Sequence, residues 1–406
     1  MTDDLNIKRN TAILASVMAI YSAVLQLGAA VLSLTFVLVT GFRSLLGAGP
    51  AIFLLASALS AFPTGRAMDR FGRVPVIATG FVLGTAGCVL TAAGTRWDSS
   101  VAVIAGFALV GASGAVTLLI RAAAGDMYPP KRRARGISLV LVGAVFGAVL
   151  GPAVFGPLFA GKDVAASTLT VPWLVAGALS LVAAAVVVTV RPDTKVIAEQ
   201  IAARTETHAP EPAAPLREIV RRPGVIPAML AAIASFGVMV SVMNLTGFVV
   251  VDHHHHAQQS VFPIIGAHVL GMYALVLVIG RVIDRIGRGP ALGGGLVVMA
   301  FSCAGLMWVT GIPMTAVLLF GLGLGWNLSF VSATAQLADA TSPAERGKLL
   351  GLNDLLAGLT GASLALLGGV ALDVLGVTAM AIGATLLALA PAIFLARLRP
   401  ASEAAA

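Results

Sequence analysis

The chain has 406 residues, of which 58% are hydrophobic and only 11% are charged, and its formal net charge is +8. Because a soluble domain carries about 25% charged residues, this composition excludes an ordinary soluble protein and indicates an integral membrane protein. The basic residues fall in alternate loops rather than in one patch, which argues against a nucleic-acid partner. The two cysteines, Cys88 and Cys303, are too few for a disulfide framework.

Twelve apolar stretches are long enough to cross a bilayer, which takes about 20 residues of helix. They lie near residues 11–38, 46–63, 75–95, 101–124, 137–160 and 169–190, and near 224–250, 260–279, 291–310, 312–335, 348–370 and 375–396. The segment between the two groups is charged and contains prolines, as is typical of a linker. We therefore predict an all-α integral membrane protein: a six-helix bundle at 1–191, a cytoplasmic linker at 192–223, and a second six-helix bundle with a short tail at 224–406.

The positions of lysine and arginine predict the orientation of the chain in the membrane. All of the 26 basic residues except Arg43, Arg96 and Lys162 fall on the side that holds both termini and the linker. Basic residues are enriched on the cytoplasmic side of membrane proteins. We therefore expect a multi-pass protein of the plasma or inner membrane with both termini in the cytoplasm.

One charged segment occurs twice: residues 65–75 read GRAMDRFGRVP, and residues 280–290 read GRVIDRIGRGP. A repeat at about half the chain length indicates duplication. Its first glycine allows close helix approach, its second allows positive φ, and its aspartate can pair with arginine or a helix N-terminus. A single copy would be interpreted as a solvated turn. Two copies predict a conformational latch between two bundles on the cytoplasmic side, made by Gly65, Asp69, Arg70, Gly72, Arg73, Gly280, Asp284, Arg285, Gly287 and Arg288.

This repeat resembles the signature loop of the major facilitator superfamily, which lies between helices 2 and 3 and again between helices 8 and 9. The resemblance extends over the whole chain, with twelve helices, two halves and a central loop. It implies two pseudo-symmetric six-helix bundles around a central cavity, which alternate between outward-open and inward-open states.

A second pair of segments matches across the halves. Residues 126–135 (DMYPPKRRAR) align with residues 339–348 (DATSPAERGK) at an offset of 213. Shortly before the first segment lies Arg121, which resembles the superfamily's helix-4 arginine motif, often implicated in proton coupling. The alternative is an arginine that extends to the membrane interface.

Asp354 is the only acidic residue inside the apolar stretches of the second half. Acidic residues within a membrane are functional candidates by default, so Asp354 and Arg121 are both predicted as coupling residues. An ion pair between Asp354 and Lys348 would explain the aspartate equally well.

The fifth apolar stretch contains Gly143, Gly147 and Gly151, each four residues from the next. Glycines at this spacing share a helix face and let another helix come close. The glycines and prolines here resemble the Gly-Pro motif of proton-coupled drug antiporters, although the adjacent glycine pair of that motif is missing.

Helices 7 and 8 are predicted to carry a soft ligand set. Met239 and Met243 lie four residues apart, as do His268 and Met272, so each pair shares a helix face. At matched depth, three thioethers and one imidazole would suit Cu(I) better than Mg²⁺ or Ca²⁺. The alternatives are methionines that only pack in the core and a polar pore histidine.

Between these helices, on the outer side, lies the run His253, His254, His255 and His256. Such a run could collect a metal above the cavity mouth. It is too irregular for a closed zinc site.

Together, the methionine pair, the His-x3-Met pair and the histidine run resemble the copper-importer (CcoA-like) branch of the superfamily. That resemblance implies that Met239, Met243, His268 and Met272 are ligands for copper as the transported substrate. The branch also includes members that move organic solutes such as riboflavin, so a proton-coupled transporter of a small organic solute or drug is the alternative.

Polar residues in other helices could line the same cavity for either substrate. They are Tyr21, Ser22, Gln26, Asn244, Asn327 and Ser329. A sensor without transport would not need two latches. An enzyme is disfavoured because the sequence contains no nucleophile–base constellation and no phosphate-binding loop. We expect a monomer in the lipid bilayer that needs no cofactor and binds a small solute or Cu(I).

Overall fold

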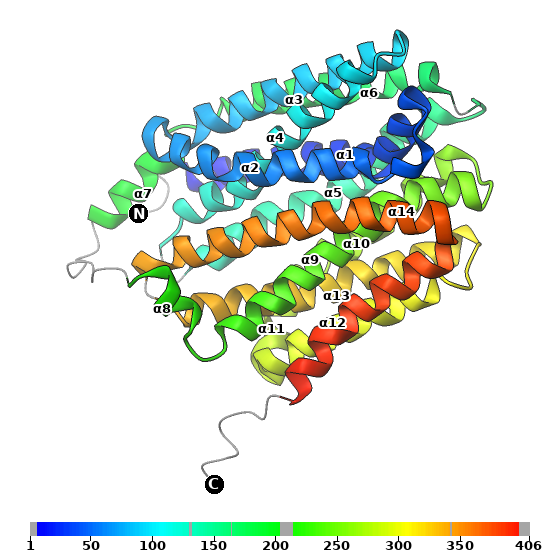
Figure 1. The fold of residues 1–406 in the computed structure, drawn as a ribbon. Coiled ribbons are helices and arrows are strands. Elements are labelled where there is room, and N and C mark those ends of the chain that lie inside the picture. The colour runs from blue at the N-terminus through cyan, green and yellow to red at the C-terminus, as the bar shows by residue number, and fades with distance from the viewer. Residues whose placement is uncertain (1–5, 130–131, 164, 204–213, 342, 398–406) are drawn as a thin grey trace.

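The computed structural model describes residues 6–129, 132–163, 165–203, 214–341 and 343–397, and within them the side chains of a few helical residues, including Asp69 and Asp284, are not described. All regular structure in these ranges is helical (Figure 1). The first half consists of α1 (Ile7–Thr40), α2 (Ala48–Phe71), α3 (Arg73–Arg96), α4 (Ser100–Asp126), α5 (Arg133–Phe159) and α6 (Thr170–Val187), with short turns η2 (Arg43–Leu45) and η4 (Ala166–Leu169).

Two short helices, α7 (Thr194–Ala203) and α8 (Leu216–Val220), lie between the halves in sequence. The second half consists of α9 (Val225–Phe248), η5 (Val249–His253), η6 (Gln258–Ser260), α10 (Val261–Tyr273), α11 (Val276–Ile286), α12 (Arg288–Gly305), α13 (Ile312–Asp339) and α14 (Pro343–Arg397). In Figure 1 the blue-to-cyan half lies above the green-to-red half, and α7 and α8 mark one end of the molecule. We call this the linker end and the opposite one the far end.

Nine helical stretches within the described ranges are long and apolar enough to cross a membrane. The last stretch bends at Gly376, where φ is 83°, and so accounts for two of the predicted spans. The predicted span 260–279 is broken between α10 and α11, and α12 corresponds to the span predicted at 291–310. At the break, the Met272 carbonyl accepts a hydrogen bond from the Asn327 side-chain amide. The predicted all-helical membrane fold is therefore confirmed.

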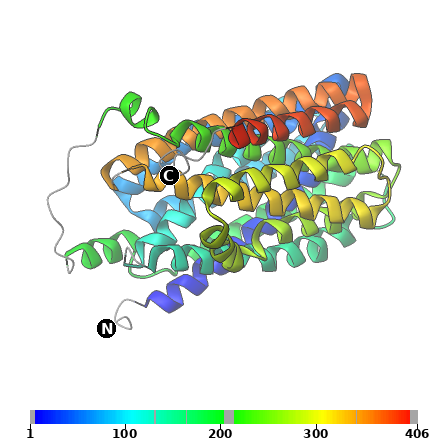
Figure 2. The same cartoon turned by 90° about the horizontal axis from the view of Figure 1, so that it is seen from below.

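Helix pairs recur in the two halves in the same order. In the first half α1 packs on α5, α2 packs on α4, and α3 packs on α4 and α6. In the second half α9 packs on α14, α10 packs on α13, and α12 packs on α13 and α14. The halves meet where α1 contacts α9, α2 contacts α14 and α5 contacts α10, and in Figure 2, seen from below, the second half lies in front. This arrangement follows the duplication indicated by the sequence repeat.

Each copy of the charged repeat ends one helix and begins the next. The first copy forms the last turns of α2 and ends it at Gly72, with φ 93° and ψ 170°. The second copy ends α11 at Gly287, with φ 85° and ψ 159°. The predicted positive φ is therefore confirmed at both positions. The predicted close helix approach is wrong in this conformation, since a Cβ at Gly65 or Gly280 would meet no atom within 4 Å.

The glycines of α5 do let another helix come close, as predicted. A Cβ at Gly143 would lie 2.0 Å from the Ala15 carbonyl oxygen, and one at Gly147 would lie 2.5 Å from that of Ala19. These contacts bring α1 against α5 at backbone distance. Because lipid tails are as apolar as the helices, such contacts at small residues contribute much of helix association in a membrane.

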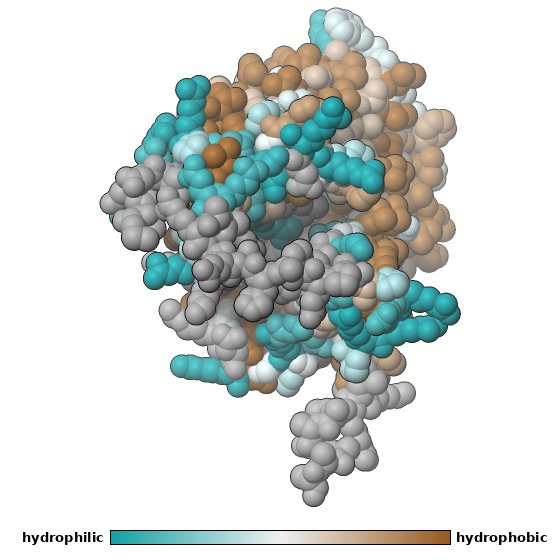
Figure 3. Space-filling view, turned by 90° about the vertical axis from the view of Figure 1, so that its left-hand side faces the viewer, coloured by the Kyte–Doolittle hydropathy of each residue, from teal (hydrophilic) through white to brown (hydrophobic). Residues whose placement is uncertain are grey.

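Large apolar side chains cover the flanks of the molecule. Phe62, Val101, Phe146 and Phe301 are among those that are more than two-thirds exposed. In Figure 3, which faces the linker end, the brown flank lies behind a teal, hydrophilic rim. A soluble protein rarely exposes so much apolar surface, and a lipid bilayer explains it.

We predict that the two glycines of the first repeat differ in their tolerance of a side chain. Gly72→Ala places a Cβ in a backbone conformation that only glycine adopts readily, which costs about 1–3 kcal/mol. Gly65→Ala lies in a helix with free space around it, so it should be neutral or stabilising by about 0.5–1 kcal/mol. Thermal unfolding in detergent should show a lower Tm for Gly72→Ala only. Equal Tm values would contradict the role of the turn.

Candidate functional site

A cavity lies between the two halves, with about 1020 Å³ of empty space that is partly open to solvent. Both halves contribute to its wall. The lining residues are Met18, Tyr21, Ser22, Leu25, Phe53, Leu54, Ser57, Gly114, Arg121 and Leu141 from the first half, and Phe236, Met239, Val240, Met243, Asn244, Val269, Met272, Tyr273, Trp326 and Phe330 from the second.

Contacts between the halves close this cavity toward the far end. A Cβ at Gly247 would lie 2.2 Å from the Ala30 carbonyl oxygen, and the Gln258 amide donates a hydrogen bond to the same oxygen over 3.2 Å. The ring centroids of Phe159 and Phe262 lie 5.4 Å apart. Arg121, near the linker end of α4, is by contrast partly exposed. The cavity therefore opens toward the linker end, where Figure 3 shows a recess inside the hydrophilic rim.

Aromatic rings form a continuous wall on the second-half side of the cavity. Trp326 and Phe330 are stacked, with centroids 5.1 Å apart and an interplanar angle of 20°. Phe236 contacts Phe330 at 6.2 Å, and Tyr273 meets the Trp326 ring edge-on at 6.4 Å. This wall was not predicted from the sequence. Its signal was the Trp326–Phe330 pair, four residues apart in a chain with only 6% aromatic residues.

Three of the four predicted copper ligands line the cavity. Met239, Met243 and Met272 are among its wall residues. His268 is not among them: it is fully buried, and its Nδ1 lies 2.8 Å from the Leu319 carbonyl oxygen on α13. The predicted set of three thioethers and one imidazole is therefore not assembled here. The four-residue spacing of His268 and Met272 gave a shared face, but it could not show how far that face turns toward α13.

The histidine run does not form a metal site. His256 Nε2 lies 2.8 Å from the Thr310 carbonyl oxygen, and the His253 ring meets Phe248 edge-on. Within the described ranges, no three side chains of His, Cys, Asp or Glu are grouped so that they could hold a metal ion. Burial lowers the pKa of His254, and the charges of His256, His253 and His255 lower it further.

The predicted polar residues divide into two groups. Tyr21, Ser22 and Asn244 line the cavity, as expected. Gln26, Asn327 and Ser329 are buried elsewhere. The Gln26 amide donates to the Gly147 carbonyl oxygen over 2.6 Å, and Asn327 donates to the Met272 carbonyl. These two side chains are buried where helices touch, and they do not line the cavity.

The two predicted coupling residues lie on opposite halves, near enough for their charges to interact. Arg121 lines the cavity from α4, and it interacts electrostatically with Asp354 on α14 and with Tyr273. The Asn353 amide donates a hydrogen bond to Asp354 over 3.3 Å. Lys348, the alternative partner of Asp354, is exposed. The structure thus brings together two charges that the sequence analysis had placed separately.

The last arginine of each repeat binds the aspartate at the start of the second matching segment. Arg73 Nε lies 2.8 Å from Asp126 Oδ2, and Arg288 pairs with Asp339 in the equivalent way. Both pairs lie within one half, and they join the two repeated segments that the sequence analysis found separately. Asp193 accepts hydrogen bonds from the backbone N–H groups of Arg73 and Val74, which ties the linker to the first half.

The latch between the halves remains a prediction, because the side chains of Asp69 and Asp284 lie outside those described. Two other latch arginines, Arg70 and Arg285, are exposed. The Arg70 guanidinium lies 5.1 Å from the centroid of the Phe71 ring.

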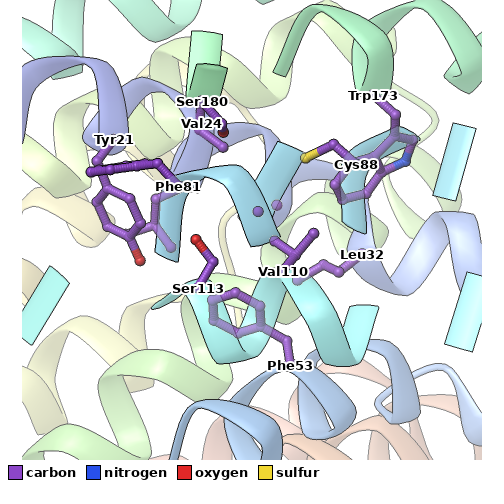
Figure 4. A pocket seen from close by; sticks show the side chains of 13 residues that line it. Tyr21, Val24, Leu32, Phe53, Phe81, Cys88, Val110, Ser113, Trp173 and Ser180 are labelled. Carbon is purple, nitrogen blue, oxygen red and sulfur yellow. The ribbon is translucent and has the colours of Figure 1, made fainter. Parts of the chain in front are cut away.

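A second pocket lies wholly inside the first half (Figure 4), with about 490 Å³ of empty space. Ser113, Ser180 and Cys88 line it, and Tyr21 and Phe53 line both this pocket and the central cavity. Among the described residues, only those of the first half border this pocket, so it is not a site shared by the two halves. The central cavity is therefore the candidate solute site.

Comparison with known proteins gives consistent matches. A family model described as Major Facilitator Superfamily matches residues 12–267 and 253–406. The MFS-type transporter YdeG of Bacillus subtilis (strain 168) is 32% identical over 344 residues, which is 81% of this chain and 77% of YdeG. The riboflavin transporter RfnT of Brucella anthropi is 30% identical over 307 residues, which is 75% of this chain and 74% of RfnT.

Solved structures share the fold at low sequence identity. The inward-open conformation of the xylose transporter XylE from E. coli has a TM-score of 0.71 at 13% identity, covering 97% of this chain and 96% of XylE. A POT family transporter in complex with 5-aminolevulinic acid has a TM-score of 0.74 at 12% identity, covering 96% of this chain and 95% of that one.

We predict that single cysteines will distinguish cavity positions from buried ones. Met239→Cys and Met243→Cys should react with a small water-soluble thiol reagent at least about tenfold faster than His268→Cys, because thiol reactivity depends on access to solvent. The native Cys88 and Cys303 are fully buried, so the parent protein supplies a low background. Mass spectrometry of the modified protein gives the rates. Equal labelling at His268 and Met243 would contradict the assigned cavity wall.

Proposed function

This chain belongs to the Major Facilitator Superfamily of transporters, and we propose that it carries a planar, partly aromatic organic solute through the central cavity by alternating access. The observation that supports this proposal is the aromatic wall formed by Phe236, Phe330, Trp326 and Tyr273. Aromatic pairs prefer offset-stacked or edge-to-face geometry, so such a wall favours a flat ring system over a sugar or a bare ion.

The rest of the cavity suits the same kind of solute. Met239, Met243 and Met272 supply flexible, polarizable contacts that adapt to an irregular apolar shape. Ser57 and Asn244 supply a few polar groups that can orient a solute. Riboflavin, named in RfnT, contains a planar ring system and polar groups, and it is the first solute to test.

Orientation follows from charge. We infer that the linker end faces the cytoplasm, because the basic residues gather there and cytoplasmic loops are enriched in lysine and arginine. In the present conformation the cavity then opens to the cytoplasm. Transport requires a second state in which the linker end closes and the far end opens.

Arg121 and Asp354 are proposed to couple transport to protons. They lie on opposite halves, and Arg121 lines the solute cavity, so their electrostatic interaction changes when the halves move. An acidic side chain within a membrane is expensive to keep charged. Protonation of Asp354 in one state would weaken its attraction to Arg121, and release of that proton on the other side of the membrane would restore the attraction.

Copper import is the second candidate, favoured by three methionines that share one cavity. Thioethers are suitable ligands for Cu(I). Against this candidate, His268 lies outside the wall and the histidine run forms no metal site. The resemblance to the copper-importer branch therefore rests here on methionines that would also suit an organic solute.

We predict that riboflavin uptake into vesicles will depend on the aromatic wall. Trp326→Ala should reduce uptake at low solute concentration about tenfold, since stacking on an aromatic ring is worth about 1–3 kcal/mol. Trp308→Ala is the matched control, because that side chain is 77% exposed. Uptake is followed by flavin fluorescence.

The same vesicles distinguish the two candidates. For a copper importer, loaded copper measured by mass spectrometry would fall in the Met239→Ala and Met243→Ala variants and stay unchanged in Trp326→Ala. Copper uptake with no flavin uptake would overturn the organic-solute proposal.

We predict that Asp354→Asn will uncouple transport from the proton gradient. The variant should still exchange labelled for unlabelled solute across the membrane, because exchange needs only solute binding and movement of the halves. It should no longer accumulate solute when a pH gradient is imposed. Accumulation equal to that of the wild type would exclude Asp354 as the coupling residue.

A further inference from the structure

Arg43 joins the two halves at the far end. It lies in η2, the connection between α1 and α2 of the first half. Its guanidinium pairs with Asp252 in η5, at the end of α9, and its Nε lies 3.7 Å from Asp373 Oδ1 on α14. The sequence analysis named Arg43 only as one of three basic residues on the outer side, and no role was assigned to it.

A third contact fixes the guanidinium. Arg43 Cζ lies 5.5 Å from the centroid of the Phe248 ring, which belongs to the second half. Phe248 is part of a buried apolar cluster with Leu34 and Leu46 of the first half and Leu372 of the second. The ion pairs therefore lie over an apolar seam, and Figures 1 and 2 show the α1–α2 connection beside the bend of α14.

The backbones approach closely beneath this group. A Cβ at Gly47 would lie 2.0 Å from the Ala365 carbonyl oxygen, and one at Gly369 would lie 2.4 Å from the Gly47 backbone nitrogen. Opening the far end must separate these backbones and so must break both ion pairs of Arg43. By contrast, Arg73–Asp126 and Arg288–Asp339 each lie within one half and can persist through that movement.

These side chains are partly exposed to solvent, as expected for ion pairs that break and re-form when the far end opens and closes. The Arg43 side chain is 57% exposed, whereas those of Asp252 and Asp373 are 26% and 19% exposed. An ion pair in contact with solvent contributes only modestly to the stability of the conformation that contains it. It can bias the population of two conformations without preventing their exchange.

We propose that Arg43, with Asp252 and Asp373, forms a far-end clasp that holds the transporter in the conformation whose cavity opens at the linker end. Loss of the clasp shifts the population toward the state with the far end open. The proposal does not depend on which solute is carried, so it stands or fails separately from the assignment of an organic solute.

The test measures the distance across the far end. Spin labels on Trp97→Cys and Trp308→Cys report on the first and second halves, since both tryptophans are at least 75% exposed and lie in far-end connections. The buried native cysteines stay unlabelled. Arg43→Gln, and separately Asp252→Asn combined with Asp373→Asn, should raise the ratio of the long-distance to the short-distance component about fivefold.

Two controls separate the clasp from a general loss of positive charge or of structure. Lys162→Gln removes another exposed basic residue and should leave the distances unchanged. Arg43→Asp combined with Asp252→Arg and Asp373→Arg reverses the charges of all three groups and should restore the short component. The proposal is overturned if Arg43→Gln gives the wild-type distance profile, if Lys162→Gln has the same effect as Arg43→Gln, or if the charge reversal fails to restore the short component.

Discussion

Close backbone contact at small residues is the constraint on which this architecture depends. A bilayer gives helices no hydrophobic reason to prefer each other over lipid, so they associate through tight packing and a few polar contacts. Within the first half, α1 meets α5 at Gly143. Between the halves, Gly247 approaches Ala30 and Gly47 approaches Ala365. These contacts between the halves lie toward the far end, which leaves room for the cavity between them and the linker end.

The two halves share one helix arrangement, as expected from duplication, but they carry different side chains at equivalent positions around the cavity. At the offset of 213 that aligns Asp126 with Asp339, Ser113 corresponds to Trp326. Ser113 lines the pocket inside the first half, whereas Trp326 supplies part of the aromatic wall on the second. The pseudo-symmetric halves therefore give a solute two chemically different surfaces. A solute held between them contacts both halves, as alternating access requires.

The fold could be predicted from the sequence because its signals are long and repeated: apolar stretches, alternating basic loops and the duplicated Asp–Arg segment. The site could be predicted only in part. Met239 and Met243 lie on the wall, but His268 turns to the Leu319 carbonyl, and spacing within one helix does not specify that rotation. Gln26 does not line the cavity for a related reason, since its amide donates a hydrogen bond to the backbone of a neighbouring helix. Because the Arg43–Asp252 pair joins residues 209 positions apart, no local sequence pattern predicts it.

The charged contacts divide according to the motion they must survive. Pairs within one half, such as Arg73–Asp126 and Arg288–Asp339, help each bundle to move as a rigid body. Pairs across the seam cannot persist in both states, so each favours one of them. Arg43 pairs with Asp252 at the far end, and the charges of Arg121 and Asp354 interact nearer the linker end. Arg43 lies in a helix connection and is in contact with solvent, whereas Arg121 lies within α4 and lines the cavity. The proposed clasp and the proposed coupling residues thus lie toward opposite ends of one cavity.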